Sequence, residues 1–309
     1  MNPPINLAGF DCESPIIMNA AGTCKSLAHV KEFAKSDVSA IVYGSITYPP
    51  RPENRGSVYY RGPGFSLNSR GMPNEGGEPH RKSLPEMAAI AHNAGKLFIV
   101  SVAGDTPDEY AVLTEIGFEA GADIVEHNWG CPNKWDGATQ GQIPAYDSQL
   151  GIEILTRTES RLGNRIKLLV KLSWLDPFSI RRYAQQVIIP FKSARGVTVI
   201  NTLANALSYN DFGHTRITPG GGLAGCAGPA ILPIALGQAK QWRDALPPHI
   251  AVIGVGGISQ EKDVADYVDR AGVTAVQIGT SFLGHSLQER NYSIFSALKG
   301  GYRFRHRDL

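Results

Sequence analysis

The chain has 309 residues and a formal net charge of +2, and its composition already excludes several classes of protein. Hydrophobic residues make up 42% and charged residues 19%, which is typical of a globular protein with a substantial core. A charge this close to neutral gives no reason to expect nucleic acid or an anionic membrane as a partner. The first residues do not resemble a signal peptide, and we find no apolar run long enough for a membrane span, so we expect neither.

Four cysteines, Cys12, Cys24, Cys131 and Cys226, are scattered along the chain. Their spacing contains neither a CxxC pair nor a zinc pattern, so we expect no metal site and no iron–sulfur cluster in this chain. Scattered cysteines in a chain of this length indicate reduced thiols, which predicts a cytoplasmic enzyme.

Eight short runs rich in valine and isoleucine recur along the chain, and most end in Gly, Ser, Thr or Asn. Near-continuous apolarity over about 4–8 residues predicts a strand buried on both faces. The runs cover residues 16–22, 40–47, 97–104, 123–128, 166–173, 197–203, 251–258 and 275–283. Helical periodicity fills most segments between them, namely residues 29–35, 83–93, 108–120, 149–161, 177–188, 230–246 and 260–271.

Strands that alternate with helices eight times predict an α/β fold with parallel strands, and the closed form of that fold is the (β/α)8, or TIM, barrel. An open doubly wound sheet is the alternative, but regularly spaced units over the whole chain favour the barrel. We find no linker and expect residues 1–309 to form a single domain. Three long connections, residues 48–82, 132–148 and 204–228, each follow a strand, which places them on the face where barrel enzymes build active sites.

Glycines gather after the last two predicted strands, in Gly254-Val255-Gly256-Gly257-Ile258 and in Gly279-Thr280-Ser281. In barrels, the loops after strands seven and eight commonly bind phosphate through exposed backbone N–H groups. The alternative is that these glycines only make tight turns. A site of this kind suits a phosphorylated substrate or a flavin mononucleotide.

The fourth predicted strand ends in Asn128-Trp129-Gly130-Cys131-Pro132-Asn133, where a thiol stands among carboxamides. Free cysteine titrates near about 8.5, close enough to neutrality for Cys131 to act as a base in a site that assists it. The alternative is an inert buried thiol, which is the common fate of a cysteine.

This segment resembles the Asn-x-x-Cys-Pro-Asn motif of class 1 dihydroorotate dehydrogenases, in which the cysteine is the catalytic base. Six other stretches resemble that family in the same order along nearly the whole chain. Any one of these motifs is weak evidence of the resemblance, whereas seven in the expected order and spacing are strong evidence. The six stretches cover residues 18–22, 68–74, 170–173, 200–202, 221–230, and the glycine loops 256–258 and 279–280 taken together.

The resemblance implies an FMN at the barrel mouth and a planar dihydropyrimidine held against it, with Cys131 as the base and no metal. The cofactor-binding residues it implies are Ala20, Ala21, Gly22, Gly44, Ser45, Lys171, Gly222, Gly256, Gly257, Gly279 and Thr280. The substrate-binding residues it implies are Lys25, Asn68, Gly71, Met72, Asn128, Asn133, Asn201 and Thr202. Asparagine suits such a ring because one side chain offers both a donor and an acceptor, although turns and caps are its commoner use.

Three residues leave room for other interpretations. Lys171 would place positive charge beside the flavin, but a lysine at a barrel strand end can also form a Schiff base, as in aldolases. Gly44 stands where soluble class 1 enzymes carry a lysine, and Lys25 resembles a lysine that the membrane-associated class 2 enzymes place after strand one. Arg70 replaces an apolar residue, and it either faces solvent or reaches a substrate carboxylate.

The resemblance therefore predicts an oxidoreductase of pyrimidine biosynthesis that oxidises dihydroorotate to orotate. The family uses fumarate, quinone, or NAD through a partner subunit as electron acceptor, and its soluble members are often homodimers. Three alternatives stay open: a flavoenzyme for uracil-like rings, a flavin-free aldolase using Lys171, and a non-catalytic flavin-binding relative.

Overall fold

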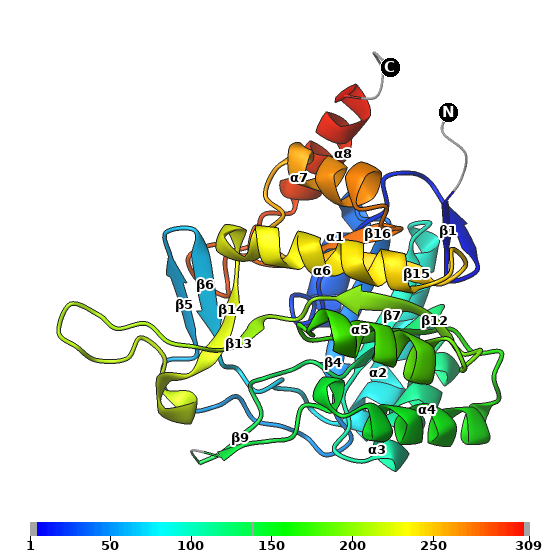
Figure 1. The fold of residues 1–309 in the computed structure, drawn as a ribbon, viewed down its shortest axis with the longest axis horizontal. Coiled ribbons are helices and arrows are strands. Elements are labelled where there is room, and N and C mark those ends of the chain that lie inside the picture. Colours follow the sequence, from blue (N-terminus) through cyan, green and yellow to red (C-terminus); the bar gives the residue numbers. More distant parts are fainter. Residues whose placement is uncertain (1–4, 138, 306–309) are drawn as a thin grey trace.

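The computed structural model describes residues 5–137 and 139–305, and its central feature is a closed barrel of eight parallel strands (Figure 1). Each strand pairs with the next along the chain, and the last pairs with the first. This confirms the predicted (β/α)8 barrel and excludes the alternative prediction of an open doubly wound sheet. The barrel strands are β3 (Ile17–Asn19), β4 (Ala40–Ile46), β7 (Leu97–Val102), β8 (Ile124–Asn128), β11 (Leu168–Leu172), β12 (Ala194–Val199), β15 (Ala251–Val255) and β16 (Ala275–Ile278).

Helices surround the barrel, and all but the last of them, α8, coincide with the helical ranges predicted from the sequence. They are α1 (Leu27–Lys35), α2 (Gly77–Asn93), α3 (Pro107–Glu119), α4 (Ser148–Leu162), α5 (Pro177–Tyr183) extended by η2 (Ala184–Ile188), α6 (Leu232–Ala245), α7 (Glu261–Ala265) extended by η5 (Asp266–Arg270), and α8 (Ser293–Arg305). Helix α2 begins at Gly77 rather than at residue 83, and Pro79 lies in its first turn, where a helix tolerates a missing N–H. Among the described residues, no helix combines the length and apolarity that a bilayer span needs.

Side chains on the barrel strands alternate between the barrel interior and the helix layer. On β8, Ile124 and Glu126 point inward, whereas His127 points outward and accepts from or donates to Thr114 of α3 at 2.8 Å. The lower interior is apolar and includes Met18, Val42, Ile99, Leu169 and Ile253, all fully buried. Burying each such side chain contributes about 1.5–3 kcal/mol, so the floor of the barrel is a rigid base for whatever the mouth binds.

The long connections carry strands that the sequence did not predict. In the first lie β5 (Tyr59–Gly62) and β6 (Phe65–Asn68), and in the third lies β14 (Ala224–Ala227), preceded by β13 (Leu203–Ala206). These four form one antiparallel sheet in the order β13-β14-β6-β5, which stands beside the barrel in Figure 1. The shorter elements are β1 (Ile5–Leu7), β2 (Phe10–Cys12), β9 (Trp135–Asp136), β10 (Thr139–Gln140), η1 (Pro144–Tyr146), η3 (Pro219–Gly222) and η4 (Pro229–Ile231).

Candidate active site

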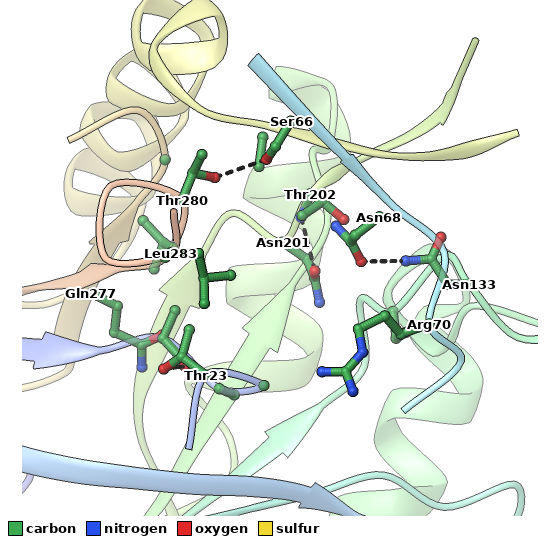
Figure 2. Close-up of a pocket in the computed structure, with 18 of the residues that line it drawn as sticks. Thr23, Ser66, Asn68, Arg70, Asn133, Asn201, Thr202, Gln277, Thr280 and Leu283 are labelled. Carbon is green, nitrogen blue, oxygen red and sulfur yellow. Dashed lines mark hydrogen bonds between the residues drawn. The ribbon is translucent and has the colours of Figure 1, made fainter. Parts of the chain in front are cut away.

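A cavity opens at the carboxyl ends of the barrel strands, where β6 and β14 form one wall (Figure 2). Its empty volume is about 1220 Å³, which includes part of the open mouth.

Most of the predicted site residues line this cavity. They are Cys131, Lys25, Asn68, Gly71, Met72, Asn128, Asn133, Asn201, Thr202, Ala20, Ala21, Gly22, Ser45, Lys171, Gly256, Gly257, Gly279 and Thr280. Residues from the first predicted strand to the last therefore meet in one place, which is how a barrel mouth is built.

Gly44 and Gly222, predicted to bind the cofactor, are not part of the cavity lining. A Cβ on Gly44 would lie 2.5 Å from the Ser101 carbonyl oxygen, and its own carbonyl accepts from the Gly22 N–H at 2.6 Å. Gly44 therefore faces strand β7, and this backbone has no space for the lysine of soluble class 1 enzymes. Gly222 packs against Thr215 and Leu207, where a Cβ would lie 2.5 Å from the Thr215 methyl carbon.

Carboxamide side chains form a cup on one side of the cavity. Asn133 donates to Asn68 at 2.9 Å, as Figure 2 shows, and Asn201 donates to Asn128 at 3.0 Å. Two buried acceptors of the cup, Asn133 Oδ1 and Thr202 Oγ1, have no hydrogen-bond partner within the described chain. Unpaired buried polar atoms are costly, so these two atoms indicate a polar ligand that completes the cup.

Cys131 follows β8 and lines the same cavity as the asparagine cup. Trp129 is fully buried, and at Gly130 a Cβ would lie 2.8 Å from the Ser173 backbone nitrogen, so the chain just before the thiol has no space for a side chain. Burial raises the pKa of Cys131, while a backbone hydrogen bond from Asn133 and the charge of Lys134 oppose that rise. Without a ligand, the thiol therefore holds its proton at neutral pH.

Two cations lie at the rim of the cavity. Lys25 donates to the backbone oxygens of Ser45 at 3.2 Å and Pro73 at 3.3 Å. Burial, followed by the nearby charge of Arg70, lowers the pKa of Lys25 to about 8. Arg70 pairs with Glu53, and Figure 2 shows its guanidinium turned toward the open centre. The rim therefore suits an anionic group on the ligand.

Lys171 projects from β11 into the floor of the cavity, where it donates to Gln277 Oε1 at 3.1 Å. Burial lowers its pKa, and the charges of Glu126 and Cys131 counteract part of that effect. A cation at this depth, with a single hydrogen bond to a neutral amide, is available to a ligand above it.

The glycine loops after β15 and β16 form the far end of the cavity. Gly256 and Gly257 have φ values of +137° and +76°, which glycine adopts readily. In the described chain, no acceptor pairs with the backbone N–H groups of Gly257, Ile258, Thr280 and Ser281. Free N–H groups gathered on two adjacent loops indicate an anion site, as the sequence predicts.

Comparison with known proteins agrees with this geometry. The family model described as dihydroorotate dehydrogenase matches residues 4–294. The chain belongs to the dihydroorotate dehydrogenase family.

Relatives in the dihydroorotate dehydrogenase family cover most of the chain. Dihydroorotate dehydrogenase (fumarate) of Lachancea kluyveri is 30% identical over 302 residues, which are 96% of this chain and 90% of that protein. Dihydroorotate dehydrogenase B (NAD(+)), catalytic subunit, of Pelobacter propionicus is 31% identical over 90% of this chain and 86% of that protein. A solved DHODH from Eimeria tenella in complex with ferulenol has a TM-score of 0.76 at 18% identity, covering 96% of this chain and 82% of that chain, which supports the fold. Family membership makes this protein an oxidoreductase and disfavours the aldolase alternative.

The family resemblance did not single out several residues that the structure places in the cavity. Gln277 is one, although a polar residue inside the apolar run 275–283 was a usable signal. Ser66 is another, and its hydroxyl oxygen lies 3.1 Å from that of Thr280, within hydrogen-bond distance. Its place in the cavity depends on the long-range pairing of β6 with β14. Thr23, Tyr59 and Gly228 also line the cavity.

Proposed function

We propose that the protein oxidises dihydroorotate to orotate in pyrimidine biosynthesis, with FMN as its cofactor. One observation carries the proposal: Cys131 shares a cavity with an incompletely paired asparagine cup and with Lys25 at the rim. A heterocycle with alternating donors and acceptors satisfies the cup, and a carboxylate on that heterocycle pairs with Lys25. The names of the relatives support the same substrate.

The residues of the cavity fit FMN. Gly257, Ile258, Thr280 and Ser281 offer unpaired N–H groups to a phosphate, and Lys171 offers a positive charge to the ring system. When bound, FMN supplies the two-electron acceptor for the oxidation.

The chain's own residues then divide the remaining tasks. The asparagine cup orients the substrate ring, and Lys25 holds its carboxylate. Cys131, as the thiolate, removes the proton from the ring carbon next to a carbonyl. Because Gly44 leaves no space for a lysine side chain, Lys25 is the lysine available for the carboxylate.

Ion pairs to Asp105 connect the loop that carries Cys131 with the β4–β5 connection. Asp105 pairs with Arg51 of the β4–β5 connection and with Lys134, three residues after the thiol. This arrangement fixes the thiol's loop against the first long connection. We propose that these two connections exclude water from the reacting atoms once substrate is bound.

An absorbance spectrum followed by anaerobic titration tests the proposed function. We expect purified protein to be yellow and dihydroorotate to bleach it, whereas dihydrouracil, which lacks the carboxylate, should bleach it far more slowly. A faster reaction with dihydrouracil would assign the protein to uracil-like rings. Yellow protein that neither compound bleaches would support the non-catalytic alternative, and protein that stays colourless with added FMN would remove the cofactor from the proposal.

Gly257 offers a test of the phosphate loops. Its φ is +76° and a Cβ would lie 2.5 Å from the Leu232 Cβ, so Gly257→Ala must displace the loop. We expect FMN affinity to fall at least about ten-fold, because loss of one or two charge-assisted hydrogen bonds costs about 1.5–3 kcal/mol each. Fluorescence titration of apoprotein with FMN measures the change. Gly237→Ala in α6, where a Cβ meets nothing within 4 Å, is the matched control and should bind FMN normally.

Further aspects of the proposal come from the family resemblance. We propose that residues 1–309 form one FMN-binding domain, and that the protein is a cytoplasmic homodimer. The relatives named above use fumarate or NAD(+), so assays with each acceptor decide which one this protein uses.

A further inference from the structure

A layer of polar side chains lies inside the barrel between the apolar floor and the cavity. Glu126 on β8 belongs to it and is fully buried, yet Glu126 does not line the cavity. Its neighbours in the layer are Lys171 on β11, Thr198 on β12 and Gln277 on β16. A carboxyl group enclosed this completely needs a specific reason, because burial of an acid is costly.

The hydrogen bonds of this layer form a chain that leads to Lys171. Thr198 Oγ1 donates to Glu126 Oε2 at 2.9 Å, and Gln277 Nε2 donates to the same oxygen at 2.8 Å. Those bonds fix the Gln277 amide, whose Oε1 then accepts from Lys171 Nζ at 3.1 Å. Glu126 therefore determines which end of the Gln277 amide faces Lys171.

Two further features support a link between Glu126 and Lys171. Glu126 Oε1 has no hydrogen-bond partner within the described chain, so the carboxyl group is not used up by structural contacts. Burial lowers the pKa of Lys171, and two groups oppose that effect: Glu126 first, and then Cys131, which does so only as the thiolate. Cys131 is a thiol whose proton must leave during the reaction, which leaves Glu126 as the constant partner.

We propose that Glu126 is a positioning residue that, through Gln277, holds Lys171 in the orientation and charge that the bound cofactor requires. The proposal rests on the proposed function, since it assumes FMN above Lys171. Glu126 itself touches neither the cofactor nor the substrate. Its effect on the flavin passes through the lysine.

Glu126→Gln keeps the shape and removes the charge. If Glu126 acts through Lys171, the variant should bind FMN about ten-fold more weakly, within the range of couplings measured in one hydrogen-bond network. The midpoint potential of the bound FMN should become more negative. Without Glu126 to orient Lys171 and to favour its protonated form, the lysine no longer places its positive charge beside the ring. If Glu126 acted directly on the flavin, loss of its negative charge would shift the potential in the positive direction.

A double-mutant cycle with Lys171→Met separates a positioning role from a structural one. We expect Glu126→Gln to change FMN affinity and potential in the wild-type background and to change neither in the Lys171→Met background. Equal changes in both backgrounds, or a positive shift in potential, would overturn the proposal. Should Glu126→Gln not fold, Gln277→Leu interrupts the same chain and must reproduce the weaker binding and the negative shift.

Ile124→Val is the matched control, since Ile124 lies on the same strand in the apolar interior below Glu126. It should lower the Tm and leave the FMN potential unchanged. The inference and the proposed function fail in different ways. Wild-type protein that never binds FMN contradicts the proposed function, whereas FMN-binding, dihydroorotate-oxidising protein with an unaltered Glu126→Gln variant contradicts only the role of Glu126.

Discussion

Cys131→Ala should slow the reduction of bound FMN by dihydroorotate by about 10²–10⁴-fold, the usual contribution of a positioned base. The variant should retain its FMN, because the substitution changes neither Lys171 nor the glycine loops after β15 and β16, which are proposed to hold the cofactor. Rapid mixing of the yellow protein with dihydroorotate under anaerobic conditions measures the rate. Cys12→Ala, in the β1–β2 hairpin, is the control and should react normally.

The pH dependence of that rate provides a second check on the same assignment. Burial raises the pKa of Cys131, so the thiolate fraction grows as pH increases through and above neutrality. The wild-type rate should therefore rise with pH, and the residual rate of Cys131→Ala should lose that rise. A wild-type rate that is independent of pH between about 6 and 9, the range around an ordinary thiol pKa, would contradict a thiol base.

Lys25→Met should raise the KM for dihydroorotate by about 10–100-fold, as expected when a charged hydrogen bond to a carboxylate is lost. The KM of the wild-type protein should also rise above pH 8, because burial lowers the pKa of Lys25 to about 8 and the amine loses its charge there. Steady-state assays over a pH series measure both effects. The variant should show no such rise.

Two comparisons make the Lys25 result specific. Lys31→Met, at an exposed position of α1, should leave the KM unchanged. Activity with dihydrouracil, which has no carboxylate, should respond little to Lys25→Met. A similar loss with both compounds would instead assign Lys25 to the structure of the rim, where it already bonds to Ser45 and Pro73.

The barrel could be predicted from the sequence because it depends on local patterns, whereas most of the cavity residues were expected from the resemblance of seven motifs to one family. A buried parallel strand is a short apolar run, and its carboxyl end is marked by the residue type that follows, as Asn128 and Gly256 illustrate. Pairing partners in the barrel also follow from chain order. The closed arrangement therefore needed no long-range information.

The side sheet and its residues could not be predicted in the same way. Strand β6 pairs with β14, so Ser66 and Asn68 find their partners about 160 positions further along the chain, at Ala227 and Gly225. That Gly44 lies outside the cavity lining could not be predicted for a different reason, since sequence position alone does not show that a Cβ there would meet the Ser101 carbonyl oxygen. Glu126 lay in a run read only as a buried strand, so its polar chain to Lys171 was not visible.

The side sheet limits how the substrate specificity of this protein can be redesigned. Asn68 donates to the Gly225 carbonyl, and a Cβ on Gly225 would collide with Thr202 Oγ1, so the segments that carry these three residues depend on one another. A chimera that imports only residues 48–76 from a relative would bring β5 and β6 without the strand β14 with which β6 pairs. Grafts should exchange residues 48–76 together with residues 203–228, because the two segments pair in one sheet and both line the cavity.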